Sequence, residues 1–374
     1  MSRRRLGITG QQGFIGKALF NSLGLLPNEF ERVPFERDFF EDQVKLEKFV
    51  SECDVIVHLA AINRHHDPEV IYETNISLVK KLLNALEKSK SKAHVLFSSS
   101  SQEERDNLYG RSKKEGRELL SNWANKSEAL FTGMIIPNVF GPFGNPYYNS
   151  FIATFSHQLT HGEQPKIDVD GYVKLIYVTE LVNIFIQEIR SKIGNALLNI
   201  PHSSEHNVSE ILKILEMYKV QYFESGIIPE LNYPFEVNLF NTFRSYIDHK
   251  NHFPIKYLNN IDSRGSFAEI IRINVGGQVS FSTTIPGIIR GNHYHTRKIE
   301  RFSVIKGKAL IQLRKIGTTE VLEFYLDGDQ PAYVDVPIWY THNIKNIGEE
   351  ELYTIFWINE FYDSNDPDTY FENV

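Results

Sequence analysis

Three histidines and one glutamate in the C-terminal third of the chain have the types and spacing of metal ligands. His293 and His295 stand at positions i and i+2, and Glu300 and His342 follow. The β-branched and aromatic residues around them predict strands, on which positions i and i+2 face the same side. Imidazole nitrogens and a carboxylate suit zinc, iron, nickel or manganese. We expect a divalent metal, with zinc favoured; histidines that only hydrogen-bond inside a β-barrel are the alternative.

A tyrosine and a lysine in the N-terminal half are spaced for proton transfer. Tyr109 and Lys113 are four residues apart, so they share one face of a helix. An ammonium group beside a phenol favours the phenolate, which lets the tyrosine exchange a proton near neutral pH. A tyrosine and a lysine occur at this spacing often by chance, so the motif indicates a catalytic pair only if the surrounding elements support it.

A glycine-rich segment near the N-terminus is the first such element. Residues 10–16, Gly-Gln-Gln-Gly-Phe-Ile-Gly, follow a predicted strand at 5–9 and precede a helical pattern. Strand, glycine turn and helix in this order predict a dinucleotide fingerprint, because the glycines let the backbone approach a pyrophosphate at the helix N-terminus. A plain tight turn is the alternative.

Two further apolar runs predict buried parallel strands. They cover residues 54–61 and 93–97, and residues 70–88 between them have helical spacing of apolar positions. This alternation predicts an α/β domain with a doubly wound parallel sheet. Ligands bind beyond the carboxyl ends of such strands, which is where the serine run 98–101 follows the second strand.

These motifs together resemble the extended short-chain dehydrogenase/reductase family over roughly residues 1–240. The matching elements are Thr9-Gly10-x-x-Gly13-x-x-Gly16, His58-Leu59-Ala60-Ala61, Asn75, the serine-ended strand, Tyr109-x-x-x-Lys113 and Pro137-Asn138-Val139-Phe140-Gly141-Pro142. The resemblance implies that Tyr109 is the general acid for ketone reduction. It implies that one serine, for which we favour Ser100, holds the carbonyl oxygen, and that Lys113 binds the nicotinamide ribose and tunes the tyrosine. Asn138 falls where the family contacts a nucleotide-sugar.

The same resemblance implies a set of cofactor-binding residues. They are Gly10, Gln12, Gly13, Phe14, Ile15, Gly16, Arg37, Leu59, Ala60 and Asn75, with Tyr109 and Lys113. Glu36 and Asp38 would favour a free 2′-hydroxyl, whereas Arg37 could pair with a 2′-phosphate, and we favour NADPH. One departure stands out: eight residues separate Ser100 from Tyr109, fewer than is usual in the family. The roof of the site is then open, or another segment closes it.

From Ile255 onward the apolar pattern shifts toward a period of two. Short β-type runs, at residues 270–273, 279–285, 302–305, 309–313, 332–336 and 353–358, alternate with turns. They predict an all-β sandwich or barrel of about 120 residues. The aromatic, proline-broken stretch around 229–254 is the expected boundary, which gives domains over residues 1–243 and 252–374.

The C-terminal motifs resemble the cupin class. The His-x-His…Glu…Gly and Pro337…His342…Asn346 elements have the spacing of the two cupin motifs, except that Trp339 replaces the usual glycine. Asp262-x-Arg264-Gly265 and Pro286–His293 are similar to nucleotide-deoxysugar 3,5-epimerases, which act on 4-keto-6-deoxy sugars through an enolate. His293 aligns with their base, and Tyr353 is a weaker candidate for the acid, a core tyrosine being the alternative. A metal-ligand role and a base role for His293 conflict, and both stay open.

Bulk composition sets the broad class. At 374 residues the chain exceeds the roughly 250–300 residues at which single cores stop growing, so two domains are expected. The net charge of −7 gives no reason to expect nucleic acid. Cys53, the single cysteine, excludes an internal disulfide. Without an apolar run of membrane-spanning length or a signal-peptide core, we expect a cytoplasmic enzyme with no membrane insertion.

The whole chain is similar to bifunctional capsular polysaccharide synthesis enzymes in which a reductase precedes a cupin. The resemblance implies a UDP-2-acetamido-2,6-dideoxy-4-hexulose substrate, a UDP-activated 4-keto-6-deoxy-HexNAc. The cupin domain would epimerise C3, and the reductase would convert the C4 ketone to UDP-2-acetamido-2,6-dideoxy-L-talose, a precursor of UDP-N-acetyl-L-fucosamine. Both families commonly form homodimers, so a homodimer is expected.

Three alternatives stay open at this point. One is a dTDP-type 4-keto-6-deoxysugar epimerase/reductase. Another is a sensor that binds NADP without turnover and uses the cupin as a ligand module, although the intact Tyr109 and Lys113 argue against it. The third is an enzyme whose cupin is a metal-dependent isomerase or dioxygenase of a different substrate.

Overall fold

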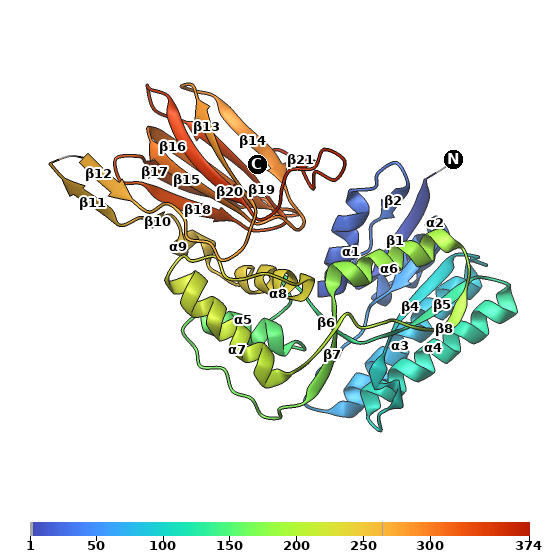
Figure 1. Cartoon of the computed structure of the whole chain (residues 1–374). Coiled ribbons are helices and arrows are strands. Elements are labelled where there is room, and N and C mark those ends of the chain that lie inside the picture. Colours follow the sequence, from blue (N-terminus) through green and yellow to red (C-terminus); the bar gives the residue numbers. More distant parts are fainter. Residues whose placement is uncertain (1–2, 264) are drawn as a thin grey trace. The chain divides into compact units, whose positions relative to one another are not determined.

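The computed structural model describes residues 3–263 and 265–374, so Arg264 of the epimerase-like motif lies outside it. The chain divides into two compact units (Figure 1). The N-terminal unit extends to Phe151 and includes Val169–Val208, and the C-terminal unit combines Ile152–Asp168 with Ser209–Val374. This division by compactness differs from the boundaries at 243 and 252, which the sequence predicts from the proline-broken stretch around 229–254 and from the change in apolar period.

A six-stranded parallel sheet forms the centre of the N-terminal unit. Its order is β2-β1-β3-β4-β5-β8, with β1 Arg4–Thr9, β2 Phe30–Val33, β3 Val55–His58, β4 His94–Ser100, β5 Phe131–Ile136 and β8 Asn195–Asn199. The apolar runs at β3 and β4 are buried along their whole length, as strands covered on both faces must be. The strand order reverses between β1 and β3, which is where ligands bind in such sheets.

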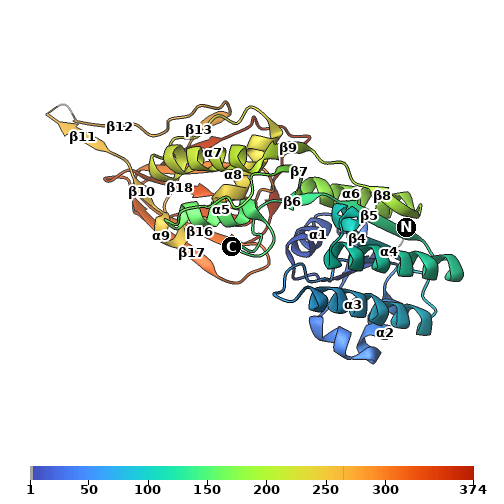
Figure 2. The same ribbon diagram turned by 90° about the horizontal axis from the view of Figure 1, so that it is seen from below.

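Helices cover both faces of this sheet (Figure 2). They are α1 Phe14–Gly24, α2 Gln43–Glu52, α3 Pro68–Lys88, α4 Leu108–Ser127 and α6 Val178–Ser191. One apolar cluster joins α2, α3 and α4 to the sheet, through residues such as Phe49, Leu82 and Leu120. Another joins α1 and α6 to it, through Leu19 and Phe185. The doubly wound α/β fold predicted from the sequence is confirmed.

Short elements complete the N-terminal unit. Two 3₁₀ turns, η1 Arg37–Glu41 and η2 Ser101–Glu104, follow β2 and β4. A second, three-stranded sheet contains β6 Asn138–Phe140, β7 Tyr172–Tyr177 and β9 Ser204–Asn207. No helix of the described ranges, 3–263 and 265–374, is both long and apolar enough to cross a membrane.

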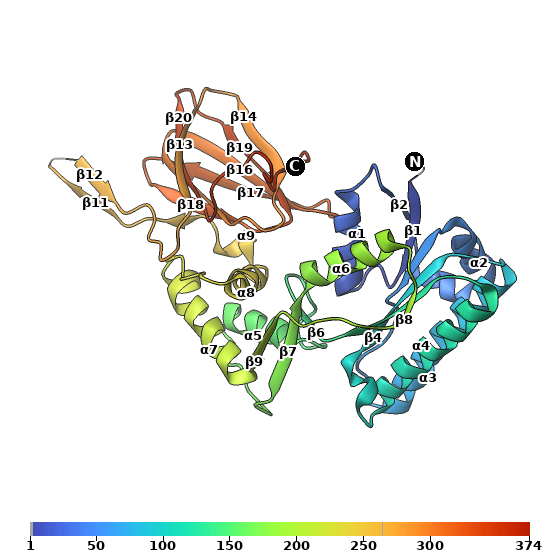
Figure 3. The same ribbon diagram turned by 45° about the vertical axis from the view of Figure 1, so that its right-hand side comes forward.

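The C-terminal unit contains two five-stranded antiparallel sheets (Figure 3). One has the order β10-β18-β15-β20-β13, with β10 Ile255–Lys256, β13 Gln278–Thr284, β15 Glu300–Lys306, β18 Ala332–Val336 and β20 Leu352–Ile358. The other has the order β17-β16-β19-β14-β21, with β14 Ile289–Tyr294, β16 Lys308–Lys315, β17 Val321–Asp327, β19 Tyr340–Asn346 and β21 Tyr370–Phe371. In β16 the alternate residues Ala309, Ile311 and Leu313 are buried, as the period of two requires. The predicted all-β region is confirmed.

Helices and a hairpin belong to the same unit. They are α5 Phe151–Thr160, α7 Val208–Tyr218, the π-helical turn η3 Lys219–Glu224, α8 Pro234–Arg244, α9 His249–His252, and a hairpin of β11 Asn259–Asp262 and β12 Gly265–Ala268. The stretch around 229–254 therefore contains a packed helix, α8, in which Leu239, Phe240 and Phe243 are fully buried.

The predicted strand at residues 270–273 is wrong. This segment forms an isolated bridge between Ile273 and Ile228, and the strand lies earlier, at Gly265–Ala268. The isoleucines have the composition of a strand, but a strand also needs a partner along its length. Here the segment meets one residue, Ile228, whose backbone accepts from Asn274 and donates to Arg272.

Candidate active sites

The glycine-rich turn between β1 and α1 has the shape that a dinucleotide pyrophosphate requires. Gly10 has a left-handed φ of +76°, and a Cβ there would lie 2.8 Å from the backbone nitrogen of Ala60. A Cβ on Gly16 would lie 2.3 Å from the carbonyl oxygen of Gly10. Gly13 caps α1 without a side-chain hydrogen bond, so the first-turn amides of the helix remain available to an anion. The turn therefore fits a bound pyrophosphate.

The other predicted cofactor residues lie around this turn. Gln12 is exposed within it, and Phe14 and Ile15 begin α1. The backbone nitrogen of Leu59, just after β3, donates to the carbonyl oxygen of Thr9 at 3.1 Å. These positions follow the order of the fingerprint and line the switch point of the sheet.

Arg37 lies beyond the end of β2 and is exposed. The next residue, Asp38, is paired with Lys45, whose Nζ lies 2.8 Å from the carboxylate. The hydrogen bond from Lys45 lowers the pKa of Asp38. The charge of this acidic residue is thus offset, and Arg37 follows β2 where a cofactor's ribose would lie.

Asn75 holds protein groups with both ends of its amide. Its Oδ1 accepts from the backbone nitrogen of Ile62 at 2.8 Å, and its Nδ2 donates to the carbonyl oxygen of Ile62 and to Ser112 Oγ, each at 3.1 Å. The side chain is buried. In this structure Asn75 fixes the segment after β3 to α4.

Ser100, Tyr109 and Lys113 lie together beyond the carboxyl end of β4. Tyr109 and Lys113 come from the first turns of α4, and the ammonium nitrogen of Lys113 lies 5.9 Å from the centre of the Tyr109 ring. That ammonium donates to the carbonyl oxygen of Ser98 at 2.8 Å. Burial raises the pKa of Tyr109 to about 12, and a hydrogen bond with the Ser100 hydroxyl opposes the rise. Burial lowers the pKa of Lys113 to about 8.

The neighbouring serines have other partners. Ser98 donates to the carbonyl oxygen of His58 at 3.2 Å, and Ser99 donates to the Glu103 carboxylate. Ser101 begins η2. The structure therefore brings the third serine of the run, Ser100, to the phenol.

An ion pair that the sequence analysis did not identify holds the short segment between Ser100 and Tyr109. The guanidinium of Arg117 in α4 makes a bidentate contact with Glu103 in η2, with distances of 2.8 to 3.2 Å, and both side chains are largely buried. Gly110 lies so close to η2 that a Cβ would come 2.0 Å from the carbonyl oxygen of Gln102. The unusually short spacing between Ser100 and Tyr109 was the feature of the sequence that could have indicated that this segment is held in place.

Asn138 stands at the start of β6 and is exposed. Its Nδ2 donates to the carbonyl oxygen of Lys174 in β7 at 3.1 Å, which fixes the orientation of the amide. The side chain can therefore present its carbonyl oxygen to a donor on a ligand.

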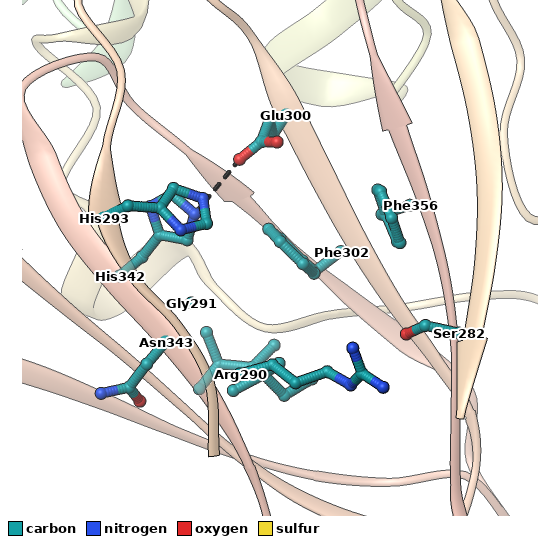
Figure 4. Close-up of a pocket in the computed structure, with 11 residues that line it drawn as sticks. Ser282, Arg290, Gly291, His293, Glu300, Phe302, His342, Asn343 and Phe356 are labelled. Carbon is teal, nitrogen blue, oxygen red and sulfur yellow. Dashed lines mark ion pairs between the residues drawn. The ribbon is translucent and has the colours of Figure 1, made fainter. Parts of the chain in front are cut away.

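His293, His295, Glu300 and His342 converge in the C-terminal unit (Figure 4). One ligand atom from each lies within 4.8 Å of all the others. Glu300 Oε2 is 3.1 Å from His295 Nε2 and 3.2 Å from His342 Nε2. Ligands at about 2.1 Å from a cation lie about 3.0–3.4 Å apart around an octahedron or a tetrahedron, so these spacings fit a metal.

The orientation of these groups favours a common cation over mutual hydrogen bonds. Among the described residues, the three buried atoms His295 Nε2, His342 Nε2 and Glu300 Oε2 have no hydrogen bond of acceptable geometry, despite their short separations. Buried polar atoms without partners are costly in a folded protein, and a cation would satisfy all three. The residues therefore fit the metal that the sequence predicts.

Backbone groups orient the outer nitrogens of the histidines. His295 Nδ1 lies 2.5 Å from the carbonyl oxygen of Asp368, and His342 Nδ1 lies 3.3 Å from that of Tyr340. The Asp368 carboxylate accepts from the backbone nitrogens of residues 296, 297 and 298 and from the Thr296 hydroxyl. Asp368 thus fixes the segment between two predicted ligands. No motif in the sequence connects Asp368 to His295, so this contact could not be predicted from the sequence.

The pKa shifts of His293 and Glu300 favour the forms that bind a metal, whereas Glu300 favours the protonated form of His295. Burial lowers the pKa of His293 to about 4, so its imidazole is neutral at pH 7. Burial alone would raise the pKa of Glu300, but contacts with His295 and His342 outweigh it and hold the pKa well below its usual value. For His295, the contact with Glu300 outweighs burial and raises the pKa.

A cavity of about 240 Å³ lies between the two sheets of this unit, beside the four converging residues. Its wall includes Ser282 and Phe356 from one sheet and Arg290 from the other. Figure 4 shows His293, His342 and Glu300 at one end of it. The cavity can therefore hold a small ligand against the imidazole of His293.

Tyr353 lies apart from this cavity. Its hydroxyl donates to Glu351 at 3.3 Å, and its ring lies 5.6 Å from that of Phe281, an exposed residue of β13. The next residue, Thr354, contacts the cavity-lining Ser282 at 3.2 Å. Because adjacent residues of a strand face opposite sides, Tyr353 points to the outer face of the sheet. The structure does not bring it to His293.

Comparison with known proteins assigns both halves of the chain. Residues 6–200 match the NAD dependent epimerase/dehydratase family, and residues 260–370 match the polysaccharide biosynthesis C-terminal domain. The first match covers more than half of the chain. This protein belongs to the NAD-dependent epimerase/dehydratase family and carries a second domain typical of polysaccharide biosynthesis.

Individual relatives extend this assignment to the whole length. A reductase from Pseudomonas aeruginosa, "UDP-2-acetamido-2,6-beta-L-arabino-hexul-4-ose reductase", is 31% identical over 97% of both chains. The crystal structure of the capsular polysaccharide assembling protein CapF from Staphylococcus aureus is 34% identical, with a TM-score of 0.63 over 99% of this chain and 100% of that one. The similarity to bifunctional capsule enzymes inferred from the sequence is thus confirmed, and the chain is a sugar-nucleotide oxidoreductase of polysaccharide biosynthesis.

A more distant structure shares the fold of the N-terminal half. RMD from Pseudomonas aeruginosa, solved with NADPH, is 21% identical over 58% of this chain and 82% of its own, with a TM-score of 0.52. At this identity the likeness concerns the fold. It agrees with the dinucleotide-binding architecture described above.

Proposed function

We propose that this chain is a bifunctional enzyme that epimerises C3 of a UDP-2-acetamido-2,6-dideoxy-4-hexulose and reduces its C4 ketone with NADPH. We assign reduction to residues 1–243 and epimerisation to residues 252–374. The observation that carries the proposal is the meeting of Ser100, Tyr109 and Lys113 beyond β4. The printed name of the Pseudomonas relative supports a UDP-linked 2-acetamido-4-ketose.

In the reductase site the protein's task is to supply a proton and hold the ketone. Tyr109 is a neutral phenol at pH 7, since its pKa is raised to about 12, so it can donate to the ketone oxygen. The Ser100 hydroxyl contacts the same phenol and can donate to that oxygen as well. The positive charge of Lys113, when present, stabilises the tyrosinate that forms. Bound nicotinamide would supply the hydride.

NADPH is favoured over NADH by the groups that follow β2. Arg37 is exposed there, and its guanidinium suits a 2′-phosphate. The neighbouring Asp38, which would repel that phosphate, is paired with Lys45, which reduces the repulsion. The product would be UDP-2-acetamido-2,6-dideoxy-L-talose.

The cavity of the C-terminal unit suits the epimerisation. A ketone at C4 acidifies the C3 proton, which a neutral imidazole can remove to form an enolate, and return of a proton to the opposite face of C3 gives the epimer. His293 faces the cavity and, with its pKa lowered to about 4, is unprotonated at pH 7. Reduction of C4 then removes the ketone that the reaction needs, so the reductase traps the epimer.

We further propose that His295, Glu300 and His342 hold a divalent cation, with zinc favoured by the mixed imidazole and carboxylate set. Such a cation would supply Lewis acidity toward a carbonyl oxygen. His293 would serve either as its fourth ligand or as the base. Metal content separates these roles: in His293→Ala a tightly bound cation should persist if His293 is the base and be lost if it is a ligand.

One experiment tests both activities. Proton NMR would follow a UDP-2-acetamido-2,6-dideoxy-4-hexulose with the purified protein in D₂O, before and after addition of NADPH. Deuterium at C3 without NADPH, followed by a C4 alcohol after its addition, is the expected result. Reduction without prior exchange would exclude the epimerase assignment, and the absence of both signals would exclude the substrate class.

A further inference from the structure

The segment that follows β6 contains two aromatic residues in a strained backbone conformation. Phe143 and Tyr147 have φ values of +65° and +59°, in the left-handed region that bulky side chains rarely adopt. Such conformations cost free energy and persist where the surrounding structure enforces them, often at sites that bind ligands. The adjacent Tyr148 keeps 39% of its surface exposed.

Two residues from the segment after β3 hold this loop. The guanidinium of Arg64 donates to the carbonyl oxygens of Tyr147 and Tyr148, at 2.9 and 3.4 Å. The backbone nitrogen of Asn63 donates to the Tyr148 hydroxyl at 3.2 Å. The Tyr148 side chain is therefore fixed by its tip, while its ring remains available.

A chain of hydrogen bonds connects the loop to the catalytic helix. Ile62, next to Asn63, is bound on both sides by the Asn75 amide, and Asn75 also donates to Ser112 Oγ at 3.1 Å. Ser112 in turn donates to the carbonyl oxygen of Tyr109 at 2.7 Å. The loop that carries Tyr148 is thus positioned relative to the Tyr109 segment by a series of hydrogen bonds, from Tyr148 to Asn63, from Ile62 to Asn75, from Asn75 to Ser112 and from Ser112 to Tyr109. In agreement, a negative charge on Tyr148 would raise the pKa of Tyr109, which places the two phenols in electrostatic range.

The segment between Ser100 and Tyr109 is shorter than is usual in the family, so it offers few residues to cover the proposed reductase site. Its 3₁₀ turn η2 is fixed to α4 by the ion pair of Glu103 and Arg117. An exposed aromatic ring near Tyr109 can supply such a cover, because aromatic faces pack well against the C–H bonds of a sugar.

We propose that Tyr148 covers the reductase site and packs against the hexose of the sugar-nucleotide, and that Arg64 is the positioning residue that holds it there. This inference rests on the proposed reductase function and deepens it. Tyr148 then contributes to binding of the ketose and not to proton transfer. Loss of its ring weakens the sugar's binding and leaves the cofactor's binding intact.

Steady-state kinetics of NADPH oxidation with the UDP-4-ketose would test the proposal, using Tyr148→Ala, Tyr148→Phe and Arg64→Met. We expect Tyr148→Ala to raise KM for the ketose about tenfold, equivalent to about 1.4 kcal/mol, with KM for NADPH unchanged. Tyr148→Phe restores the ring and should lie close to the wild type. Arg64→Met should raise the KM for the ketose by a smaller factor than Tyr148→Ala does. Tyr325→Phe, in an exposed position of β17, is the matched control and should behave as wild type.

A binding measurement keeps this test separate from the reaction itself. Calorimetric titration of the NADP⁺-saturated protein with UDP-N-acetylglucosamine, which has no ketone, should show the same order of affinities among the variants. Equal affinity and equal KM for Tyr148→Ala and wild type would overturn the inference, even in an active enzyme. A wild type that binds the probe but never oxidises NADPH would refute the reductase function, and the binding order would still decide the role of Tyr148. A wild type that does not bind the probe would overturn both.

Discussion

Burial acts in opposite directions on the two titratable groups of the reductase site. It raises the pKa of Tyr109 to about 12, which keeps the phenol protonated, and it lowers the pKa of Lys113 to about 8, which makes its charge sensitive to pH. At the residue scale, the proposed reduction would therefore use a neutral acid, Tyr109, beside a cation, Lys113, that is only just retained at physiological pH.

The Tyr109→Phe variant should separate the two proposed activities. The change removes the proton donor and keeps the ring, so NADPH oxidation should fall by roughly 10²–10⁴-fold. Deuterium exchange at C3 should continue at the wild-type rate, because it depends on the cavity of the other unit. Titration with NADPH provides the control that the cofactor still binds. Simultaneous loss of exchange and reduction would contradict the assignment of two sites.

The pH dependence of reduction should report the Lys113 charge. Lys113 is charged below its pKa of about 8 and neutral above it, so kcat/KM for reduction should fall tenfold per pH unit as the pH rises past about 8. The Glu103 carboxylate opposes the effect of burial on this pKa, and Glu103→Gln should therefore shift the fall to lower pH. Profiles measured from pH 6 to 10 would test this; the same break in Glu103→Gln as in wild type would contradict it.

At the element scale, the strands that carry or adjoin the four converging histidine and glutamate residues depend on loops that close around them. Trp339 occupies a left-handed conformation, with φ of +61°, at the position where the related motif has glycine. Its backbone nitrogen donates to the carbonyl oxygen of His295 at 2.7 Å, and its ring stacks on Tyr294 with 5.7 Å between centroids. These contacts hold Trp339 in a backbone conformation that a bulky residue rarely adopts.

The Asp368→Ala variant should loosen the segment between His295 and Glu300. It removes the carboxylate that accepts hydrogen bonds from the backbone nitrogens of residues 296–298, and those nitrogens lose this acceptor. We expect a loss of about 2–3 kcal/mol in unfolding free energy and a lower content of bound metal, measured by urea unfolding and elemental analysis. Asp366→Ala is the control, because its exposed contact with Arg297 should contribute less than about 1 kcal/mol. Equal effects of the two changes would contradict this role of Asp368.

The sequence predicted those elements that are defined by interactions between residues close together in the chain. Local periodicity predicted three of the parallel strands, β1, β3 and β4, the helix α3, and the antiparallel strands β13, β15, β16, β18 and β20, since these patterns repeat within a few residues. Asp368 contacts His295 across 73 positions, and no local pattern records such a contact. The strand expected at 270–273 failed because the segment meets one residue, Ile228, and no strand along its length, which local periodicity does not record. The metal, the homodimer and the domain limits stay predictions.

At the scale of the whole molecule, the barrel is not a unit by itself. The helical segments at residues 152–168 and 209–251 belong to the same compact unit as the barrel strands. A buried ion pair is the centre of this connection. Arg301 in β15 makes a bidentate contact with Asp335 in β18, at 2.7 and 2.9 Å, and both side chains are 2% exposed. Tyr222 of η3 donates to the same carboxylate at 2.7 Å.

A second buried guanidinium, that of Arg244, also has the Asp335 carboxylate as its counter-charge. Arg244 at the end of α8 is fully buried, and it donates to the Tyr222 hydroxyl at 3.1 Å and to the carbonyl oxygen of Val336 at 2.9 Å. Burial opposes the charged form of Asp335, but Arg301 and Arg244 outweigh it and lower its pKa. One buried carboxylate thus balances two buried cations from the barrel and from the helical segment.

The Asp335→Asn variant should therefore destabilise the C-terminal unit far more than the loss of one hydrogen bond. Asparagine keeps the shape but leaves two buried guanidiniums without a counter-charge, so we expect a loss of about 3–5 kcal/mol. Tyr222→Phe removes a hydroxyl that donates to Asp335 and accepts from Arg244 but leaves all charges in place, so it should cost less, about 1.5–3 kcal/mol. Urea unfolding followed by the fluorescence of Trp339 and Trp357, in a Trp123→Phe background, would isolate this unit. If the two variants were equally stable, charge balance would not be what joins the helical segment to the barrel.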